Sequence, residues 1–355
     1  NYVAYVAGAS AVGYRIDELK GATLSLSPAT INGIFGGVIS KWNDPSIAND
    51  IKTNPTWGNS KKKSDVKGAT ALWENVTTTS AKITVSMLPA TLKANKGKKI
   101  EWIDDTTKKV VKTLTVGTKA EASMTSAVNP KDKYSIKVGG KTIATYSQIS
   151  VTLPDLAIQV VYRADTSGTT NNFCQYMAGA SNPDWKINDA FQSCVPGGIT
   201  AYGSRFVGQP QSNNQANYIA STNGAIGYGE VSYYTDPSRA AQGVRAANIR
   251  NAAGKYVAPT SAGYNSHLAG GTQDEKGLIT FNWKQTTNPT AYPLGATTYG
   301  LCQTASDAKN KVVAQFFQWV ISDFAPKNAE ALAYTPLLGA TATNALALAK
   351  KCGAS

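Results

Sequence analysis

The stretch Leu156-Ala-Ile-Gln-Val-Val-Tyr-Arg163-Ala-Asp-Thr-Ser-Gly-Thr-Thr170 decides the fold class. Its first seven residues form a short apolar run rich in β-branched side chains, which predicts a buried strand. The residues after this strand lead into a helical segment that begins near Asn172. A buried strand that passes through a short turn into a helix is typical of α/β proteins.

The turn between this strand and helix also carries hydrogen-bond donors. A helix N-terminus presents free backbone N–H groups to an anion, and the hydroxyls of Ser167 and Thr169 can donate as well. Gly168 allows a ligand to approach the backbone closely. Arg163 offers a planar fork of donors to an oxyanion or a neighbouring carboxylate, and Asp165 could orient Arg163 or cap the helix. The same spacing fits an ordinary helix cap without a ligand, so both interpretations stay open.

The flanking sequence extends the α/β pattern. Residues 3–14 predict an apolar opening strand broken by glycines. Ser27-Pro28 predicts an N-cap followed by proline at the first helical position, with a helix through Ile34. Trp42, Trp185 and Trp319 are expected to be core or lobe-packing residues and not a platform for a sugar.

Composition restricts the class of protein. The chain has 355 residues, of which 42% are hydrophobic, and a net charge of +13, which excludes a disordered protein. Its single histidine, His267, lies in a segment that predicts a surface loop. A His-rich metal site and a His-based catalytic triad are therefore not expected. We expect no enzymatic activity, no metal and no cofactor.

The charge is concentrated in one segment. Residues 58–150 contain 17 Lys, no Arg and 7 acidic residues, a net charge of +10, whereas the rest of the chain carries +3. Short alternating strands and the hairpin dipeptide Gly139-Gly140 predict a small inserted all-β sandwich of the size of one immunoglobulin-like module. The strand candidates are residues 81–87, 98–103, 109–116, 133–138 and 141–146.

The partner of this basic module is left open by the sequence. Nucleic acid is not expected, because readers of nucleic acid usually add arginine forks and stacking aromatic residues. Lysines that alternate with apolar residues fit a solvated, aggregation-resistant face. An anionic cell-surface polymer is the remaining candidate.

The cysteines are four in number and fall into two separated pairs. No Cys-x-x-Cys spacing occurs, so a zinc site or a thioredoxin-like site has no support. Proximity in sequence predicts the disulfides Cys174–Cys194 and Cys302–Cys352, and four buried free thiols are the alternative. The Asn-, Thr-, Ser- and Gly-rich composition favours an exported protein with disulfides.

Several segments, in order along the chain, resemble the phosphate-binding protein of bacterial phosphate ABC transporters, which has a periplasmic-binding-type fold of two lobes. Arg163-Ala-Asp-Thr-Ser-Gly-Thr-Thr170 resembles the phosphate loop of that family, and Asn223-Gly-Ala-Ile-Gly-Tyr228 resembles one of its strands. The other segments that carry the resemblance are residues 26–45, 291–294, 316–319 and 333–337.

The resemblance implies a phosphate site. Its residues would be Arg163, Asp165, Ser167, Gly168 and Thr169, together with Ser212 and Asn213 in the loop of residues 208–214. It also implies inorganic phosphate as the ligand and an ABC permease as a partner.

The resemblance covers residues 1–57 and 151–355, so the basic module is an insertion. It implies that residues 1–57 and 151–250 form the second lobe, and that residues 251–355 return to the hinge and form the C-terminal half of the first lobe. No segment of this sequence resembles the family's opening segment, which carries the acid that accepts the phosphate proton. A separate N-terminal segment or a neighbouring subunit is expected to complete the first lobe.

Two functions follow from these observations. The first is an exported, extracellular or periplasmic phosphate-binding protein for an ABC importer, which the Ser-Gly-Thr-Thr turn favours. The second is a surface structural, adhesive or filament-forming protein that reuses the fold, which the insertion and the incomplete lobe favour. Without a matching acid, we expect the chain by itself to bind phosphate weakly and to distinguish it poorly from sulfate.

Overall fold

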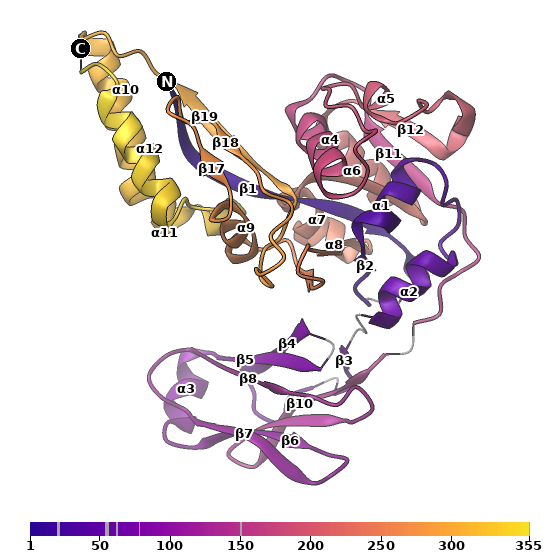
Figure 1. The fold of residues 1–355 in the computed structure, drawn as a ribbon. Helices are drawn as coiled ribbons and strands as arrows, with labels where there is room; N and C mark the ends of the chain where they lie inside the picture. Colours follow the sequence, from indigo (N-terminus) through magenta and orange to yellow (C-terminus); the bar gives the residue numbers. More distant parts are fainter. Residues whose placement is uncertain (20–21, 54–56, 62, 78, 150, 355) are drawn as a thin grey trace. The chain divides into compact units, whose positions relative to one another are not determined.

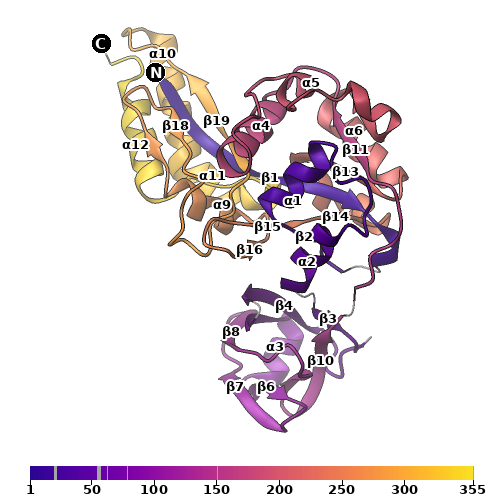
Figure 2. The same cartoon turned by 45° about the vertical axis from the view of Figure 1, so that its right-hand side comes forward.

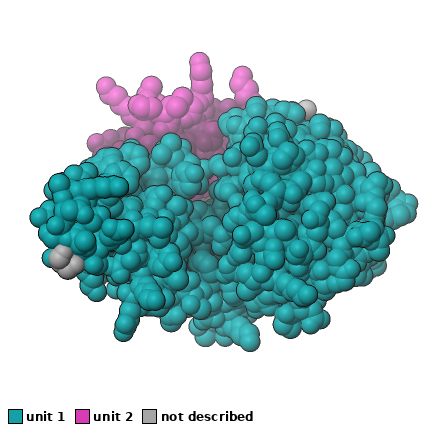
Figure 3. Space-filling view, turned by 90° about the horizontal axis from the view of Figure 1, so that it is seen from above, with its two compact units in different colours: residues 1–48, 153–355 teal, residues 49–152 magenta. Residues whose placement is uncertain are grey.

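The computed structural model describes residues 1–19, 22–53, 57–61, 63–77, 79–149 and 151–354. The chain divides into two compact units, which are coloured separately in Figure 3. Unit 1 consists of Asn1–Ala48 and Leu153–Ser355, and unit 2 is the continuous segment Asn49–Thr152.

Unit 1 is built on a mixed sheet in which β11 lies between β12 and β13 and runs parallel to both (Figure 1). Because the three strands are parallel, their C-terminal residues lie at the same edge of the sheet. These residues are Arg163, Gln209 and Glu230. The strands of this sheet are β1 (Tyr2–Arg15), β11 (Gln159–Arg163), β12 (Phe206–Gln209), β13 (Ala225–Glu230), β14 (Val244–Ala246) and β19 (Gly295–Leu301).

Strand β1 changes partners along its length. Its first half pairs antiparallel with β19, and its second half pairs antiparallel with β13 and β14. The predicted interruption at glycines was wrong, because β1 is continuous from Tyr2 to Arg15. Gly13 lies within the strand against the ring of Tyr234, and a Cβ there would overlap that ring. Glycine at this position permits close packing instead of a break.

Several helices of unit 1 pack on this sheet, among them α4 and α6 (Figures 1 and 2). Helix α6 packs on β11, β12, β13 and β1, and α4 packs on β13. The helices of unit 1 are α1 (Pro28–Phe35), α2 (Pro45–Thr53, which continues into unit 2), α4 (Gly168–Ala180), α5 (Phe191–Cys194), α6 (Gln211–Ser221), α7 (Val231–Thr235), α8 (Pro237–Ala241), α9 (Ser261–Leu268), α10 (Ala308–Trp319), α11 (Ala325–Asn328) and α12 (Gly339–Lys351).

Shorter elements complete unit 1. Strands β2 (Ser25–Leu26), β15 (Asn248–Arg250) and β16 (Tyr256–Val257) form one small sheet, and β17 (Thr272–Gln273) pairs with β18 (Ile279–Thr280). The remaining helical turns are η1 (Asp17–Leu19), η2 (Thr200–Arg205), the π-helical η3 (Val320–Phe324) and η4 (Glu330–Leu332).

An aromatic cluster fills the core below the start of α4. Phe173 stacks on Tyr228 with ring centroids 4.4 Å apart, and Phe35 lies 4.8 Å from Phe173. Phe191 joins the same cluster, and the four side chains are at most 1% exposed. Because Phe173 lies in α4 and Tyr228 in β13, this packing fixes the first turns of α4 over the sheet.

The prediction that His267 lies in a surface loop was wrong, and Trp319 is not a core residue. His267 lies in α9 and is only 2% exposed, packed between the rings of Tyr264 and Phe281. Burial lowers the pKa of His267 to about 4, because desolvation disfavours the charged imidazolium. Trp319 ends α10 and is 48% exposed, whereas Trp42 and Trp185 are buried as expected.

The C-terminal part of unit 1 is held together by α10 and α12, which pack on each other beside β1 and β19 (Figures 1 and 2). The disulfide Cys302–Cys352 connects the end of β19 to the end of α12. Helix α10 leaves Val312, Phe316 and Trp319 exposed, at 63%, 51% and 48%.

Unit 2 consists of two antiparallel sheets around one cluster of buried hydrophobic residues. One sheet has the order β3-β10-β9-β6-β7, and the other has the order β4-β5-β8. Its elements are β3 (Trp57–Asn59), β4 (Ala69–Thr77), β5 (Ser80–Met87), α3 (Pro89–Asn95), β6 (Lys99–Asp104), β7 (Lys109–Thr115), β8 (Glu121–Ala127), β9 (Tyr134–Val138) and β10 (Lys141–Gln148).

The hairpin predicted at Gly139-Gly140 joins β9 to β10. Both glycines have positive φ, 55° and 79°, as a two-residue hairpin turn requires. The five predicted strands correspond to β5, β6, β7, β9 and β10, whereas β3, β4, β8 and α3 were not predicted.

Candidate anion-binding site

The candidate site lies where β11 ends and α4 begins. Ser167 has extended backbone angles, φ −151° and ψ 130°, and is the N-cap of α4. Its Oγ accepts a hydrogen bond from the N–H of Thr169 at 3.2 Å. The N–H groups of the first turn have no partner inside a helix, so Gly168 and Thr170 present theirs at the positive end of α4. A Cβ at Gly168 would meet open space, so the helix start is accessible.

Arg163 is held in a fixed orientation beside this helix start. Its Nε and Nη2 donate to the two carboxylate oxygens of Asp165 at 2.8 and 2.6 Å, and its Nη1 donates to Oγ of Ser212 at 2.9 Å. A guanidinium has five N–H donors, so one N–H on each terminal nitrogen remains for a ligand. The structure therefore brings Arg163, Asp165 and Ser212 together.

The ion pair affects both charged groups. The hydrogen bond from Arg163 holds the pKa of Asp165 well below its ordinary value, and the bond to Asp165 raises the pKa of Arg163. Asp165 Oδ1 also accepts the backbone N–H of Gln211 at 3.0 Å. Gln211 has a φ of 63°, which is uncommon for a residue other than glycine, and it is the first residue of α6. Asp165 thus ties the end of β11 to the start of α6.

Two hydroxyls in the first turn of α4 connect this helix to β13. Thr169 Oγ1 donates to Oε1 of Glu230 at 2.7 Å, and Thr170 Oγ1 lies 2.8 Å from the hydroxyl of Tyr228. The hydroxyl of Tyr228 also accepts the N–H of Arg163 at 3.4 Å. Burial raises the pKa of Tyr228, so its hydroxyl stays protonated.

Glu230 and Tyr228 were not predicted as site residues. A usable signal existed, because the segment of residues 223–228 was recognised as a strand and Glu230 follows it by two residues. Parallel pairing of that strand with β11 would have placed its end beside Arg163.

The side chain of Asn213 is hydrogen-bonded to a different arginine, Arg239. Its side-chain oxygen accepts a hydrogen bond from Arg239, which also donates to Asn217 on the same helix. Within the described residues, no hydrogen bond joins Asn213 to Arg163, Ser212 or the start of α4.

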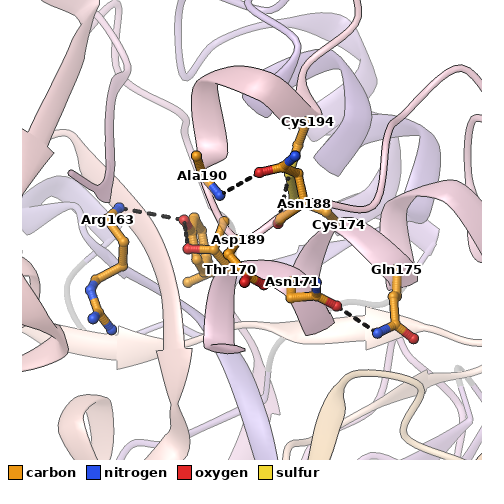
Figure 4. The surroundings of a disulfide bond; sticks show 10 residues. Arg163, Thr170, Asn171, Cys174, Gln175, Asn188, Asp189, Ala190 and Cys194 are labelled. Atoms are coloured by element: carbon orange, nitrogen blue, oxygen red, sulfur yellow. Dashed lines mark hydrogen bonds between the residues drawn. A yellow bond between two sulfur atoms is a disulfide. The ribbon is translucent and has the colours of Figure 1, made fainter. Parts of the chain in front are cut away.

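The disulfide Cys174–Cys194 stabilises the segment that faces the loop (Figure 4). It links α4 to α5, the pairing that sequence proximity predicted. In the segment that it closes, the carbonyl of Asp189 accepts the N–H of Ser167 at 3.0 Å. The Asp189 carboxylate accepts from Asn171 at 2.8 Å. The start of α4 is therefore fixed from a second side.

The described part of the chain contains no group of three or more His, Cys, Asp or Glu side chains arranged to hold a metal ion. None of its helices has the length and apolar character needed to cross a membrane.

A family model described as a PBP superfamily domain matches residues 124–323, more than half of the chain. The chain belongs to the PBP superfamily. Phosphate-binding protein PstS of Xylella fastidiosa is 31% identical to this PBP-superfamily chain over 191 residues, 52% of this chain and 48% of that protein. Phosphate-binding protein PstS 3 of Mycobacterium tuberculosis is 33% identical over 181 residues, 48% of this chain and 44% of that protein. The chain spans about half the length of the curated relatives it matches.

Solved structures show the same fold. A crystal structure of a DING protein has a TM-score of 0.53 at 15% identity, over 98% of this chain and 71% of that protein. A high-affinity periplasmic phosphate-binding protein, described as bound with phosphate, has a TM-score of 0.51 at 16% identity, over 98% of this chain and 70% of that protein. The α/β periplasmic-binding-type fold predicted from the sequence is therefore confirmed.

Proposed function

We propose that this chain is an exported phosphate-binding receptor of ABC-transporter type, with its ligand at the start of α4. The observation that carries the proposal is the convergence of the oriented Arg163 guanidinium and the first turn of α4 at the C-terminal edge of the sheet. The guanidinium supplies charge and the helix supplies neutral donors, which together suit a tetrahedral oxyanion. The relatives named as phosphate-binding proteins favour phosphate as that oxyanion.

Export and an ABC permease are parts of the same proposal. Two disulfides support an oxidising compartment, because disulfides persist mainly in exported proteins. A permease partner follows from the resemblance to the importer family. A chain that serves as a receptor has no reaction to perform, so we propose that it is not an enzyme.

Calorimetric titration of the 355-residue chain with inorganic phosphate tests the proposal. We expect saturable binding that Arg163→Ala weakens strongly, because each lost charge-assisted hydrogen bond costs about 1.5–3 kcal/mol. Arg250→Ala is the matched control, since Arg250 is an exposed arginine at the end of β15. Absence of phosphate binding by the unaltered chain, or equal loss in both variants, would contradict the proposal.

One observation favours a second function, a surface protein that assembles through unit 1. Val312, Phe316 and Trp319 recur at helical spacing on α10 and are about half exposed or more. Contiguous exposed apolar residues often mark an interaction face. Light scattering across a concentration series tests this function: association that Phe316→Glu abolishes would support it, and a monomer at every concentration would oppose it.

For unit 2 we propose that its lysines either keep the module solvated or bind an anionic cell-surface polymer, and that it does not bind nucleic acid. Its net charge of +10 comes from lysine alone over residues 58–150. Retention of isolated unit 2 on an anionic polysaccharide column, lost at moderate salt, would favour the polymer.

A further inference from the structure

The two hydroxyls at the start of α4 are bonded in opposite directions. Ser167 Oγ accepts the N–H of Thr169. A hydroxyl has a single proton and can also accept, so the proton of Ser167 remains available to an incoming anion. Ser212 Oγ accepts from Arg163 in the same way and also keeps its proton.

Thr169 is bonded the other way. Its Oγ1 donates to Oε1 of Glu230 at 2.7 Å. The proton of Thr169 is therefore directed toward Glu230. What Thr169 Oγ1 presents to a ligand is a lone pair.

Glu230 is suited to keep this arrangement. It is the last residue of β13, paired with Ser10 of β1, so its backbone is fixed in the sheet. Its Oε2 is buried and, among the residues that the structure describes, has no hydrogen-bond partner. A buried carboxylate with one oxygen unpartnered holds its single hydrogen bond, from Thr169, firmly, because losing it would leave a second buried acceptor unpaired. The charge of Glu230 contributes to the raised pKa values of two ionisable groups nearby, Arg163 and Tyr234.

We propose that Glu230, acting through the Thr169 hydroxyl, gives the site an acceptor for the proton of a hydrogen phosphate. The inference rests on the proposed phosphate-binding function and adds the specificity of that site. Near neutral pH inorganic phosphate carries at least one proton, whereas sulfate carries none. A protonated oxygen can donate to Thr169, but a bare sulfate oxygen meets its lone pair and is repelled.

This assignment changes what we expect of the chain. No residue of the sequence matched the family's proton-accepting acid, which predicted poor discrimination between phosphate and sulfate. Glu230, the last residue of β13, is not among the residues that the resemblance implied, and it supplies an acceptor within unit 1. It is a positioning residue, because it acts on the ligand through Thr169.

The substitution Glu230→Gln reverses the direction of this hydrogen bond. The glutamine amide can donate to Thr169 Oγ1, which then turns its proton toward the ligand. In calorimetric titrations with inorganic phosphate and with sulfate, we expect phosphate affinity to fall and sulfate affinity to rise. The ratio of the two should fall about tenfold or more, which corresponds to one hydrogen bond exchanged for a repulsion.

Three further variants separate specificity from folding. Thr169→Val removes the hydroxyl but keeps the shape of the side chain, so the ratio of phosphate affinity to sulfate affinity should fall in this variant too. Adding Glu230→Gln to Thr169→Val should then leave that ratio unchanged. Thr169→Ser should restore selectivity. Glu275→Gln is the matched control, an exposed glutamate changed in the same way.

The outcomes distinguish this inference from the function on which it rests. A selective unaltered chain whose ratio is unchanged by both Glu230→Gln and Thr169→Val refutes the role of Glu230 and leaves the phosphate site standing. An unaltered chain that binds phosphate and sulfate equally refutes it as well. An unaltered chain that binds neither anion refutes the proposed function, and the inference with it.

Discussion

Substitutions at Ser167 can separate its role as a helix cap from its proposed role in ligand binding. As N-cap of α4 it accepts the N–H of Thr169 at 3.2 Å, and its hydroxyl proton remains available to the proposed ligand. Alanine and glycine both remove the hydroxyl. They differ in capping, because alanine at an N-cap costs about 1 kcal/mol of stability whereas glycine costs only a few tenths.

The two variants should therefore differ in stability and agree in binding. We expect the free energy of unfolding to fall by about 1 kcal/mol in Ser167→Ala and by a few tenths in Ser167→Gly. The lost hydrogen bond to an anion is charge-assisted and worth about 1.5–3 kcal/mol. The phosphate Kd should then rise by roughly ten- to a hundredfold in both variants.

Urea unfolding and phosphate calorimetry on the same preparations measure the two effects. Ser27→Ala is the matched control, because Ser27 caps α1 by accepting the N–H of Thr30 at 3.3 Å. The two serines are equally buried, at 8% and 9% exposed. Ser27→Ala should lower stability and leave phosphate binding unchanged. If Ser167→Gly binds phosphate as tightly as the unaltered chain, Ser167 is only a cap and the placement of the ligand is wrong.

Three more predictions follow from the same structure. Replacing Cys174 and Cys194 by serine should lower the free energy of unfolding by about 3 kcal/mol, from the entropy of a 20-residue loop, and weaken phosphate binding; denaturant unfolding and calorimetry measure both. Because the pKa of Asp165 is lowered in the folded state, its ionised carboxylate stabilises the fold at pH values above the ordinary carboxyl pKa, and this stabilisation is lost as pH falls through the folded pKa. Asp165→Asn should therefore lower the free energy of unfolding at pH 7 and lower it progressively less in acid, as urea unfolding at each pH would measure. Replacing residues 57–149 with a Gly-Ser linker should leave the phosphate Kd unchanged, because every hydrogen-bond partner described for the site lies in unit 1.

Local patterns in the sequence predicted the elements that contain the site. The apolar run before Arg163 predicted β11, and the helical segment expected from Asn172 corresponds to α4, which begins four residues earlier, at Gly168. Ser27-Pro28 predicted α1 to within one residue of its end. These features depend on neighbouring residues, so one sequence carries enough information to place them.

Features set by tertiary packing were missed. Strand β8 has little apolar signal, since Met124 is its one fully buried side chain, and its partner β5 determines its conformation. His267 looked like a loop residue because α9 has scarcely any apolar periodicity, yet Tyr264 and Phe281 enclose it. Trp319 looked like a core residue because tryptophan usually is, and no property of the residue itself predicts its exposure on α10.

The chemistry of the candidate site follows from the order of the strands more than from the loop motif. The motif itself provides Arg163, Asp165 and Ser167, which suffice to attract an oxyanion of any kind. Glu230 lies 61 residues after Thr169 in the sequence, and it reaches the loop only because β13 runs parallel to β11 and ends at the same edge. Moved to another scaffold, the loop would keep its donors, and the Thr169 hydroxyl would be free to donate as well. An anion site of this kind would bind sulfate and phosphate alike, so we expect selectivity to depend on the sheet edge that holds Glu230 in place.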